Sequence, residues 1–94
     1  MMDILLVDDN ADYLFPMKEA LYEHGYNVYA ADDGYQACII MSAAHVDLIV
    51  SDIKMPNFDG IKLHEVAREM KQYAKTKFVF ISGYRDVYSD KLQL

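Results

Sequence analysis

The hydrophobic residues of the chain follow two different spacings. Short apolar runs without charge in their interiors are typical of buried strands, and we place four of them at 3–7, 27–31, 47–51 and 77–81. The longer segments between them place apolar residues at i, i+3, i+4 and i+7, which is the spacing of an amphipathic helix. The chain therefore alternates strands with helices.

The first helix is predicted to begin near Asn10 and to end at Gly25. Asparagine caps helix starts well, and glycine commonly follows the last turn. Pro16 falls about one turn inside and removes one backbone donor, so we expect a slight bend rather than a break. The face of this helix that turns inward is formed by Leu14, Met17 and Leu21.

Two more helices follow the second and third strands. The inward face of the second helix, which begins after 32–34, is formed by Ala37, Ile40, Met41 and Ala44. The third follows a loop over 52–60 and presents Leu63, Val66, Ala67 and Met70. A further helix is expected to start at 86. Uncharged strands separated by such helices predict a parallel sheet covered on both faces, and right-handed crossovers make it doubly wound.

Acidic residues stand where two of these strands end. Asp8 and Asp9 follow the first strand, and Asp52 follows the third. If these strands are parallel neighbours, the three carboxylates emerge at one edge of the sheet, where function gathers in doubly wound folds. Crowded carboxylates repel one another, and a hard cation such as Mg²⁺ compensates for that repulsion. The pattern predicts a metal site. A helix cap at Asp8 or Asp9, and a turn residue at Asp52, are the alternative explanations.

Composition narrows the setting. The chain has 94 residues, a length typical of one small domain, and a net charge of −6 from 9 Lys and Arg against 15 Asp and Glu. The basic residues are scattered, so binding to nucleic acid or to an anionic membrane is not expected. The single cysteine, Cys38, lies in an apolar stretch and is predicted to pack as an inert hydrophobe. With no apolar run of membrane-spanning length, we expect a cytoplasmic protein.

Histidines and loop residues receive structural explanations. The histidines are far apart and lack ligand spacing, so we expect them to be solvated; they are His24, His45 and His64. Within the loop over 52–60, Pro56 is expected to stiffen the chain, and Gly60 to permit a tight entry to the next helix.

Three segments in order resemble the receiver domain of two-component response regulators. They are LLVDDN at 5–10, DIKMPNFDG at 52–60, and FVFI at 78–81 followed by Ser82 and Gly83. Their order, spacing and position at strand ends all match, and the resemblance runs from Asp3 to the last residue. It implies a flavodoxin-like α/β fold with strand order 2-1-3-4.

The resemblance also implies roles for individual residues. Asp52 is similar to the family's phosphoacceptor, which takes a phosphoryl group from a sensor histidine kinase or a phosphotransfer protein. Asp8, Asp9, Asp52 and the backbone carbonyl of Lys54 correspond to the Mg²⁺ ligands. Ser82 matches the hydroxyl residue that senses the phosphoryl group. Lys54 and Tyr84 stand where the lifetime of the acyl phosphate is tuned, and a bulky Tyr84 is expected to shield it.

The chain departs from the family at its end. Receivers continue with a fifth strand carrying a lysine that pairs with the phosphoryl group, and with a fifth helix; 1–94 corresponds to a single receiver domain without these elements. None of Lys75, Lys77 and Lys91 is a credible substitute for that lysine. A fourth strand left as an uncovered edge predicts self-association.

Three functions follow from this comparison. A signalling receiver that accepts a phosphoryl group on Asp52, and is not a turnover enzyme, is the leading hypothesis. A receiver-like interaction or dimerisation module without productive phosphorylation is the second. A Mg²⁺-dependent phosphohydrolase is the third, although the chain lacks an Asp-x-Asp pair.

Overall fold

The computed structural model describes residues 1–81. The elements are β1 (Asp3–Val7), α1 (Ala11–Glu23), β2 (Asn27–Ala31), α2 (Gly34–Ala43), β3 (Leu48–Asp52), α3 (Gly60–Glu69), the 3-10 turn η1 (Lys71–Tyr73) and β4 (Lys77–Ile81). The strands form a parallel sheet in the order β2-β1-β3-β4, as predicted. None of the helices within this range has the length and apolar character needed to cross a membrane.

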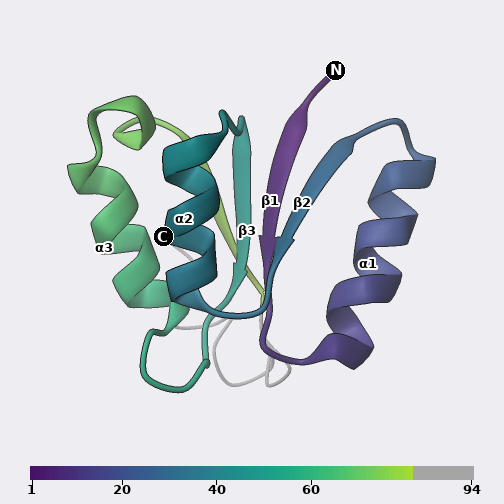
Figure 1. Cartoon of the computed structure of the whole chain (residues 1–94), viewed down its shortest axis with the longest axis horizontal. Helices are drawn as coiled ribbons and strands as arrows, with labels where there is room; N and C mark the ends of the chain where they lie inside the picture. The colour runs from purple at the N-terminus through teal and green to yellow at the C-terminus, as the bar shows by residue number, and fades with distance from the viewer. Residues whose placement is uncertain (82–94) are drawn as a thin grey trace.

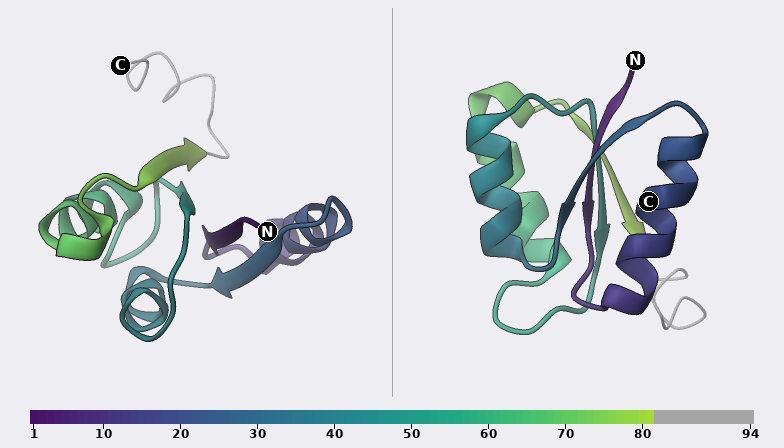
Figure 2. Two further views of the ribbon diagram at one scale, coloured as in Figure 1. Left: turned by 90° about the horizontal axis from the view of Figure 1, so that it is seen from above. Right: turned by 45° about the vertical axis from the view of Figure 1, so that its right-hand side comes forward.

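Helices cover both faces of the sheet. Figures 1 and 2 show α1 on one face and α2 with α3 on the other. Because side chains alternate along a strand, Leu5 and Val7 of β1 enter the core beneath α2 and α3. Ile4 and Leu6 are also buried, on the side where α1 contributes Leu14. The predicted doubly wound architecture is confirmed.

Strand bounds agree with the predictions except in β3. This strand runs from Leu48 to Asp52, one residue later than expected. The reason lies in the pairing with β4, because Asp52 is opposite Ile81 and the amide of Ile53 donates to the Ile81 carbonyl at 3.0 Å. Asp52 is thus the last residue of a paired strand and not the first residue of a loop.

The ends of α1 follow the predicted chemistry. The Asn10 side chain accepts a hydrogen bond from the Asp12 amide at 3.0 Å, which caps the helix start. The chain leaves the helix through Gly25, whose φ of 93° lies in the left-handed region that glycine tolerates. The helix continues through Pro16 without a break.

Aspartates cap the other two helices. The carboxylate of Asp33 accepts from the Gln36 amide at 2.7 Å, and that of Asp59 accepts from the Lys62 amide at 2.8 Å. Ala44 and Met70, which were predicted to belong to the inward faces of α2 and α3, occupy the C-cap positions just beyond the helices.

One prediction about burial needs correction. His64, predicted to be solvated, is half-buried, and its ring centroid lies 5.0 Å from that of Phe78 and 5.6 Å from that of Phe80. Burial, reinforced by the nearby Arg68, lowers the pKa of His64. Cys38 is half-buried and packs against the core as a hydrophobic residue, as predicted, and burial raises the pKa of its thiol.

Tyr73 joins η1 to the end of α2. Its ring is fully buried, and its hydroxyl lies 2.8 Å from the Met41 carbonyl and 2.7 Å from the Ala44 carbonyl. Carbonyls in the last turn of a helix have no partner within the helix. The hydroxyl therefore satisfies groups that burial would otherwise leave unpaired.

We expect Tyr73→Phe to lower the free energy of unfolding by about 1–2 kcal/mol, because it leaves buried carbonyls without a donor while keeping the ring. Urea denaturation followed by circular dichroism measures this loss. The matched control is Tyr22→Phe, since Tyr22 is 69% exposed and should tolerate the same change. Equal midpoints for the two variants would contradict the role given to the Tyr73 hydroxyl.

Candidate functional site

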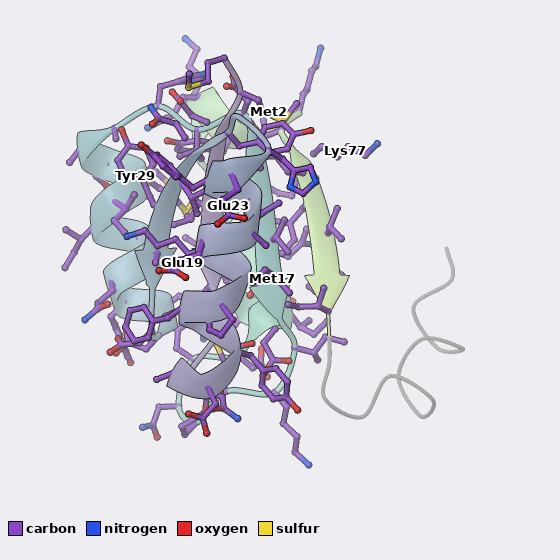
Figure 3. All side chains as sticks on the ribbon, turned by 90° about the vertical axis from the view of Figure 1, so that its right-hand side faces the viewer. Met2, Met17, Glu19, Glu23, Tyr29 and Lys77 are labelled. Atoms are coloured by element: carbon purple, nitrogen blue, oxygen red, sulfur yellow. The ribbon has the colours of Figure 1, made fainter. Side chains whose placement is uncertain are left out.

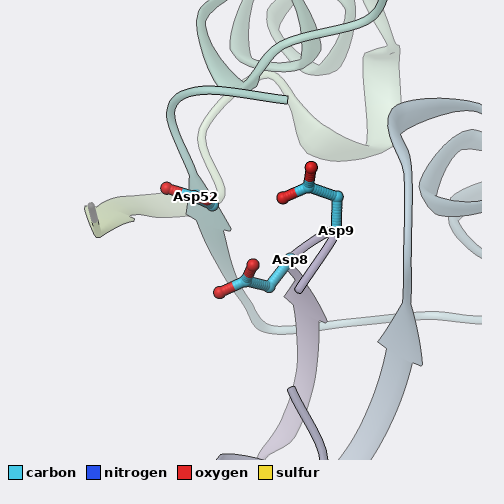
Figure 4. A group of neighbouring side chains, drawn as sticks. All are labelled: Asp8, Asp9 and Asp52. Carbon is cyan, nitrogen blue, oxygen red and sulfur yellow. The ribbon is translucent and has the colours of Figure 1, made fainter. Parts of the chain in front are cut away.

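Three carboxylates meet at the carboxyl edge of the sheet. Asp8 and Asp9 follow β1, and Asp52 ends β3, which lies beside β1. Figure 4 shows the three side chains at these neighbouring strand ends, and one carboxylate oxygen from each lies within 4.8 Å of the others. The sequence-based prediction of an acidic cluster is therefore confirmed by the geometry.

Asp8 is fixed from both sides. Its amide donates to the Ala31 carbonyl at 3.1 Å, which ties the end of β1 to the end of β2. Its carboxylate accepts a hydrogen bond from the Asn10 amide at 2.9 Å, and the side chain is buried. Asp9 is exposed, so the pair places one carboxylate inside the edge and the other on its surface.

Asp52 is held by the backbone around it. Its carboxylate accepts hydrogen bonds from the amides of Ile53, at 2.8 Å, and of Lys54. Its carbonyl accepts from the hydroxyl of the buried Ser51 at 2.8 Å. Gly60 packs directly on the same carbonyl, and a side-chain carbon at position 60 would collide with it. Gly60 was predicted only to permit a tight entry to the next helix, and the sequence gives no sign of its contact with Asp52.

The loop between β3 and α3 is anchored by apolar side chains. Met55 and Phe58 are buried, and the Phe58 ring lies so close to Gly34 that a side chain at position 34 has no room. The same ring packs edge-on against Tyr35, with centroids 4.9 Å apart. The loop that begins beside Asp52 is thereby attached to the start of α2, which the spacing of residues alone did not reveal.

Burial and charge crowding act together on the acids. Burial, with further contributions from the Asp8 and Asp9 charges, raises the pKa of Asp52 to about 6. Burial likewise raises the pKa of Asp8, helped by its neighbour Asp9 and opposed by the hydrogen bond from Asn10. Both shifts show that the protein holds these negative charges at an energetic cost, which a bound cation would remove.

The donor set fits a divalent metal ion. Carboxylate oxygens are the preferred ligands of Mg²⁺, and an octahedral ion with bonds of about 2.1 Å places its ligand oxygens roughly 3 to 4 Å apart. One oxygen from each of the three carboxylates lies within 4.8 Å of the others, which is close to this range.

Only some of the other predicted site residues lie within the part of the chain that the structure describes. Lys54 is exposed and begins the loop two residues after Asp52. Lys77 begins β4 and lies opposite Leu48, whereas Asp52 lies opposite Ile81 at the other end of the strand (Figure 3). This position agrees with the prediction that Lys77 does not pair with the phosphoryl group. Ser82, Tyr84 and Lys91 lie outside the described residues, and the roles predicted for the first two remain predictions.

Comparison with known proteins agrees with this geometry. The model of the response regulator receiver domain family matches residues 4–93. The chain belongs to this family. It is 38% identical over 85 residues to the sensor kinase CckA of Brucella abortus, covering 88% of this chain and 9% of that protein. It is 33% identical over 89 residues to the aerobic respiration control protein ArcA of Escherichia coli, covering 95% of this chain and 36% of that protein.

Solved structures support the same assignment. The chemotaxis response regulator CheY4 of Vibrio cholerae matches with a TM-score of 0.82 and 31% identity, over 85% of this chain and 67% of that one. The receiver domain of a histidine kinase from Syntrophus aciditrophicus matches with a TM-score of 0.81 and 27% identity, over 98% and 72%. The chain thus spans a small part of these curated relatives and most of the solved receiver domains.

The raised pKa of Asp52 makes stability depend on pH. A carboxyl whose pKa is higher in the folded than in the unfolded state destabilises the fold when it ionises. The free energy of unfolding should therefore fall as the pH rises from about 4 to 6 and Asp52 loses its proton. Without divalent cations, we expect Asp52→Asn to raise the free energy of unfolding at pH 7.5 by about 1–2 kcal/mol, after allowance for solvent screening. At pH 4 the gain should nearly vanish.

Chemical denaturation at both pH values measures this effect. The control is Asp47→Asn, because a hydrogen bond from the Asp3 amide lowers the pKa of Asp47, and its neutralisation should give no gain at pH 7.5. A gain for Asp52→Asn that is the same at pH 4 and pH 7.5 would refute the electrostatic explanation.

Proposed function

We propose that the chain is a single phosphoacceptor domain over residues 1–94, in which Asp52 receives a phosphoryl group during two-component signal transduction. The observation that carries the proposal is the position of Asp52 at the end of β3, with its carboxylate within 4.8 Å of the oxygens of Asp8 and Asp9. The phosphoryl donor is the phosphohistidine of a sensor kinase or of a phosphotransfer protein. The domain changes its own covalent state and does not turn over an external substrate.

The transfer step uses Asp52 as the nucleophile. A carboxylate oxygen attacks phosphorus, a P–O bond forms as the P–N bond to the histidine breaks, and the imidazole leaves with the electron pair of that bond. With a pKa of about 6, Asp52 is mostly ionised at neutral pH and needs no general base. The hydrogen bonds from the Ile53 and Lys54 amides orient the carboxylate.

The residues around Asp52 fit a role in holding Mg²⁺. We assign direct ligation to Asp9 and Asp52, a water-mediated contact to the buried Asp8, and a further ligand to the Lys54 carbonyl. When bound, the ion offsets the negative charge of the entering phosphoryl group and favours the ionised form of Asp52. Ser82 is assigned to sensing the phosphoryl group, and Lys54 with Tyr84 to tuning the lifetime of the acyl phosphate.

Self-association through β4 is a second part of the proposal. This strand is the outer strand of the described sheet, and Val79 on it is 38% exposed. An outer strand offers backbone donors and acceptors to another chain. The comparisons give no support to a phosphohydrolase or to an interaction module without phosphorylation.

Incubation with acetyl phosphate and Mg²⁺ should add one phosphoryl group to the wild-type protein, visible by intact mass at neutral pH. Asp52→Asn should remove the adduct, because an amide is not a nucleophile for phosphorus. Asp32→Asn is the matched control, since Asp32 is exposed and follows β2 at the same edge of the sheet. An adduct that persists in Asp52→Asn, or no adduct on the wild type, would contradict the assignment.

Isothermal titration at pH 7.5 should show weak Mg²⁺ binding that Asp9→Ala abolishes, since it removes a direct ligand. Asp32→Ala changes the net charge by the same amount and should keep the affinity. Because protons compete for Asp52, binding should also weaken as the pH falls below about 6. Equal affinities in Asp9→Ala and wild type would count against the metal assignment.

A further inference from the structure

The helix α2 differs from the other helices in charge. Within the described residues, α1 and α3 carry acidic and basic side chains on their exposed positions, as surface helices normally do. The sequence of α2, GYQACIIMSA, contains no ionisable acid or base apart from Tyr35 and Cys38. A helix without a charged face is usually covered on more than one side.

The outer face of α2 is nevertheless exposed in the monomer. Ala37 and Met41 point into the core, whereas Tyr35 is 60% and Ile39 is 68% exposed. Figure 1 shows α2 running along the near side of the molecule, in front of the sheet. The edge-on contact with Phe58 supports the Tyr35 ring on one side, so this exposed aromatic is held in place at the start of the helix.

We propose that the outer face of α2 binds the same face of a second copy of this chain, with the two helices antiparallel and a two-fold axis beside Ile39. The order of side chains on this face is self-complementary under that symmetry. Tyr35 lies four residues before Ile39, and the small residues Ser42 and Ala43 lie three and four after it. Antiparallel pairing sets the large Tyr35 of each copy against the small residues of the other, and Ile39 against Ile39.

Charge also favours a second copy over other occupants. The chain carries a net charge of −6, so most surface contacts between two copies bring like charges together. Contact through α2 avoids this repulsion, because no charged side chain projects from the face formed by Tyr35, Gln36, Ile39, Ser42 and Ala43. Anionic lipid or nucleic acid would meet a surface without a basic residue.

The size of the contact sets its strength. A helix of 10 residues is about 15 Å long, and one pair of such helices buries less than the roughly 1,200 Å² of a stable interface. The dimer is therefore weak and depends on concentration. The proposal does not rest on phosphorylation of Asp52, because the outer face of α2 contains none of the acidic site residues.

Sedimentation velocity from 10 to 500 µM, without Mg²⁺ or phosphoryl donor, is the primary test. We expect the wild type to shift from monomer to dimer across this range. Ile39→Glu places two like charges beside the axis and should move the transition to higher concentration, leaving only the association that β4 supports. Tyr22→Glu is the control, because Tyr22 is 69% exposed on α1 and should not alter the shift. Circular dichroism verifies that both variants fold.

A cysteine at position 39 tests the geometry directly. Ile39→Cys combined with Cys38→Ser should form a disulfide-linked dimer under mild oxidation far faster than Tyr22→Cys with Cys38→Ser. A wild type that stays monomeric, a monomer–dimer transition that Ile39→Glu leaves unchanged, or equal rates for the two cysteine variants would overturn the proposal. An unchanged transition in Ile39→Glu would favour pairing through β4 alone.

Discussion

The structure depends on the parallel pairing of strands that have no charge in their interiors. This pairing brings the carboxyl ends of the strands to one edge of the sheet. Parallel pairing of β1 and β3 leaves Asp8 and Asp52 side by side, and the pKa values of both are raised. The fold stabilises itself by burying strand interiors, and in doing so concentrates negative charge where those strands stop. The acidic site thus lowers the stability of the fold, the rest of the domain offsets this loss, and a bound cation would remove it.

Features set by local sequence could be predicted. The bounds of β1, β2 and β4 follow from apolar runs, and the cap at Asn10 and the glycine after α1 follow from well-known preferences. The strand order and the acidic site came from the resemblance together with strand-end positions. The features that could not be predicted involve segments far apart in the sequence. His64 lies beside Phe78, and Gly60 packs on the Asp52 carbonyl with no room for a side chain. Both contacts depend on how α3 packs on the sheet.

Several of these contacts join the site to the helices above it. Phe58 links the loop after β3 to α2 at Gly34, and Tyr73 joins the other end of α2 to η1. The helix is therefore fixed at both ends by side chains from elsewhere in the chain. A helix held in this way presents its outer face as a rigid surface, which reduces the entropy lost when another molecule binds there.

Glycines at two positions serve different purposes, and substitution distinguishes them. Gly25 has a φ of 93° and nothing within 4 Å of an added carbon, so its requirement is conformational and asparagine is a tolerable replacement. Gly60 does not have such a φ, and its requirement is space alone. A side chain at position 25 would meet no neighbouring atom, whereas one at position 60 would displace the carbonyl of Asp52 itself.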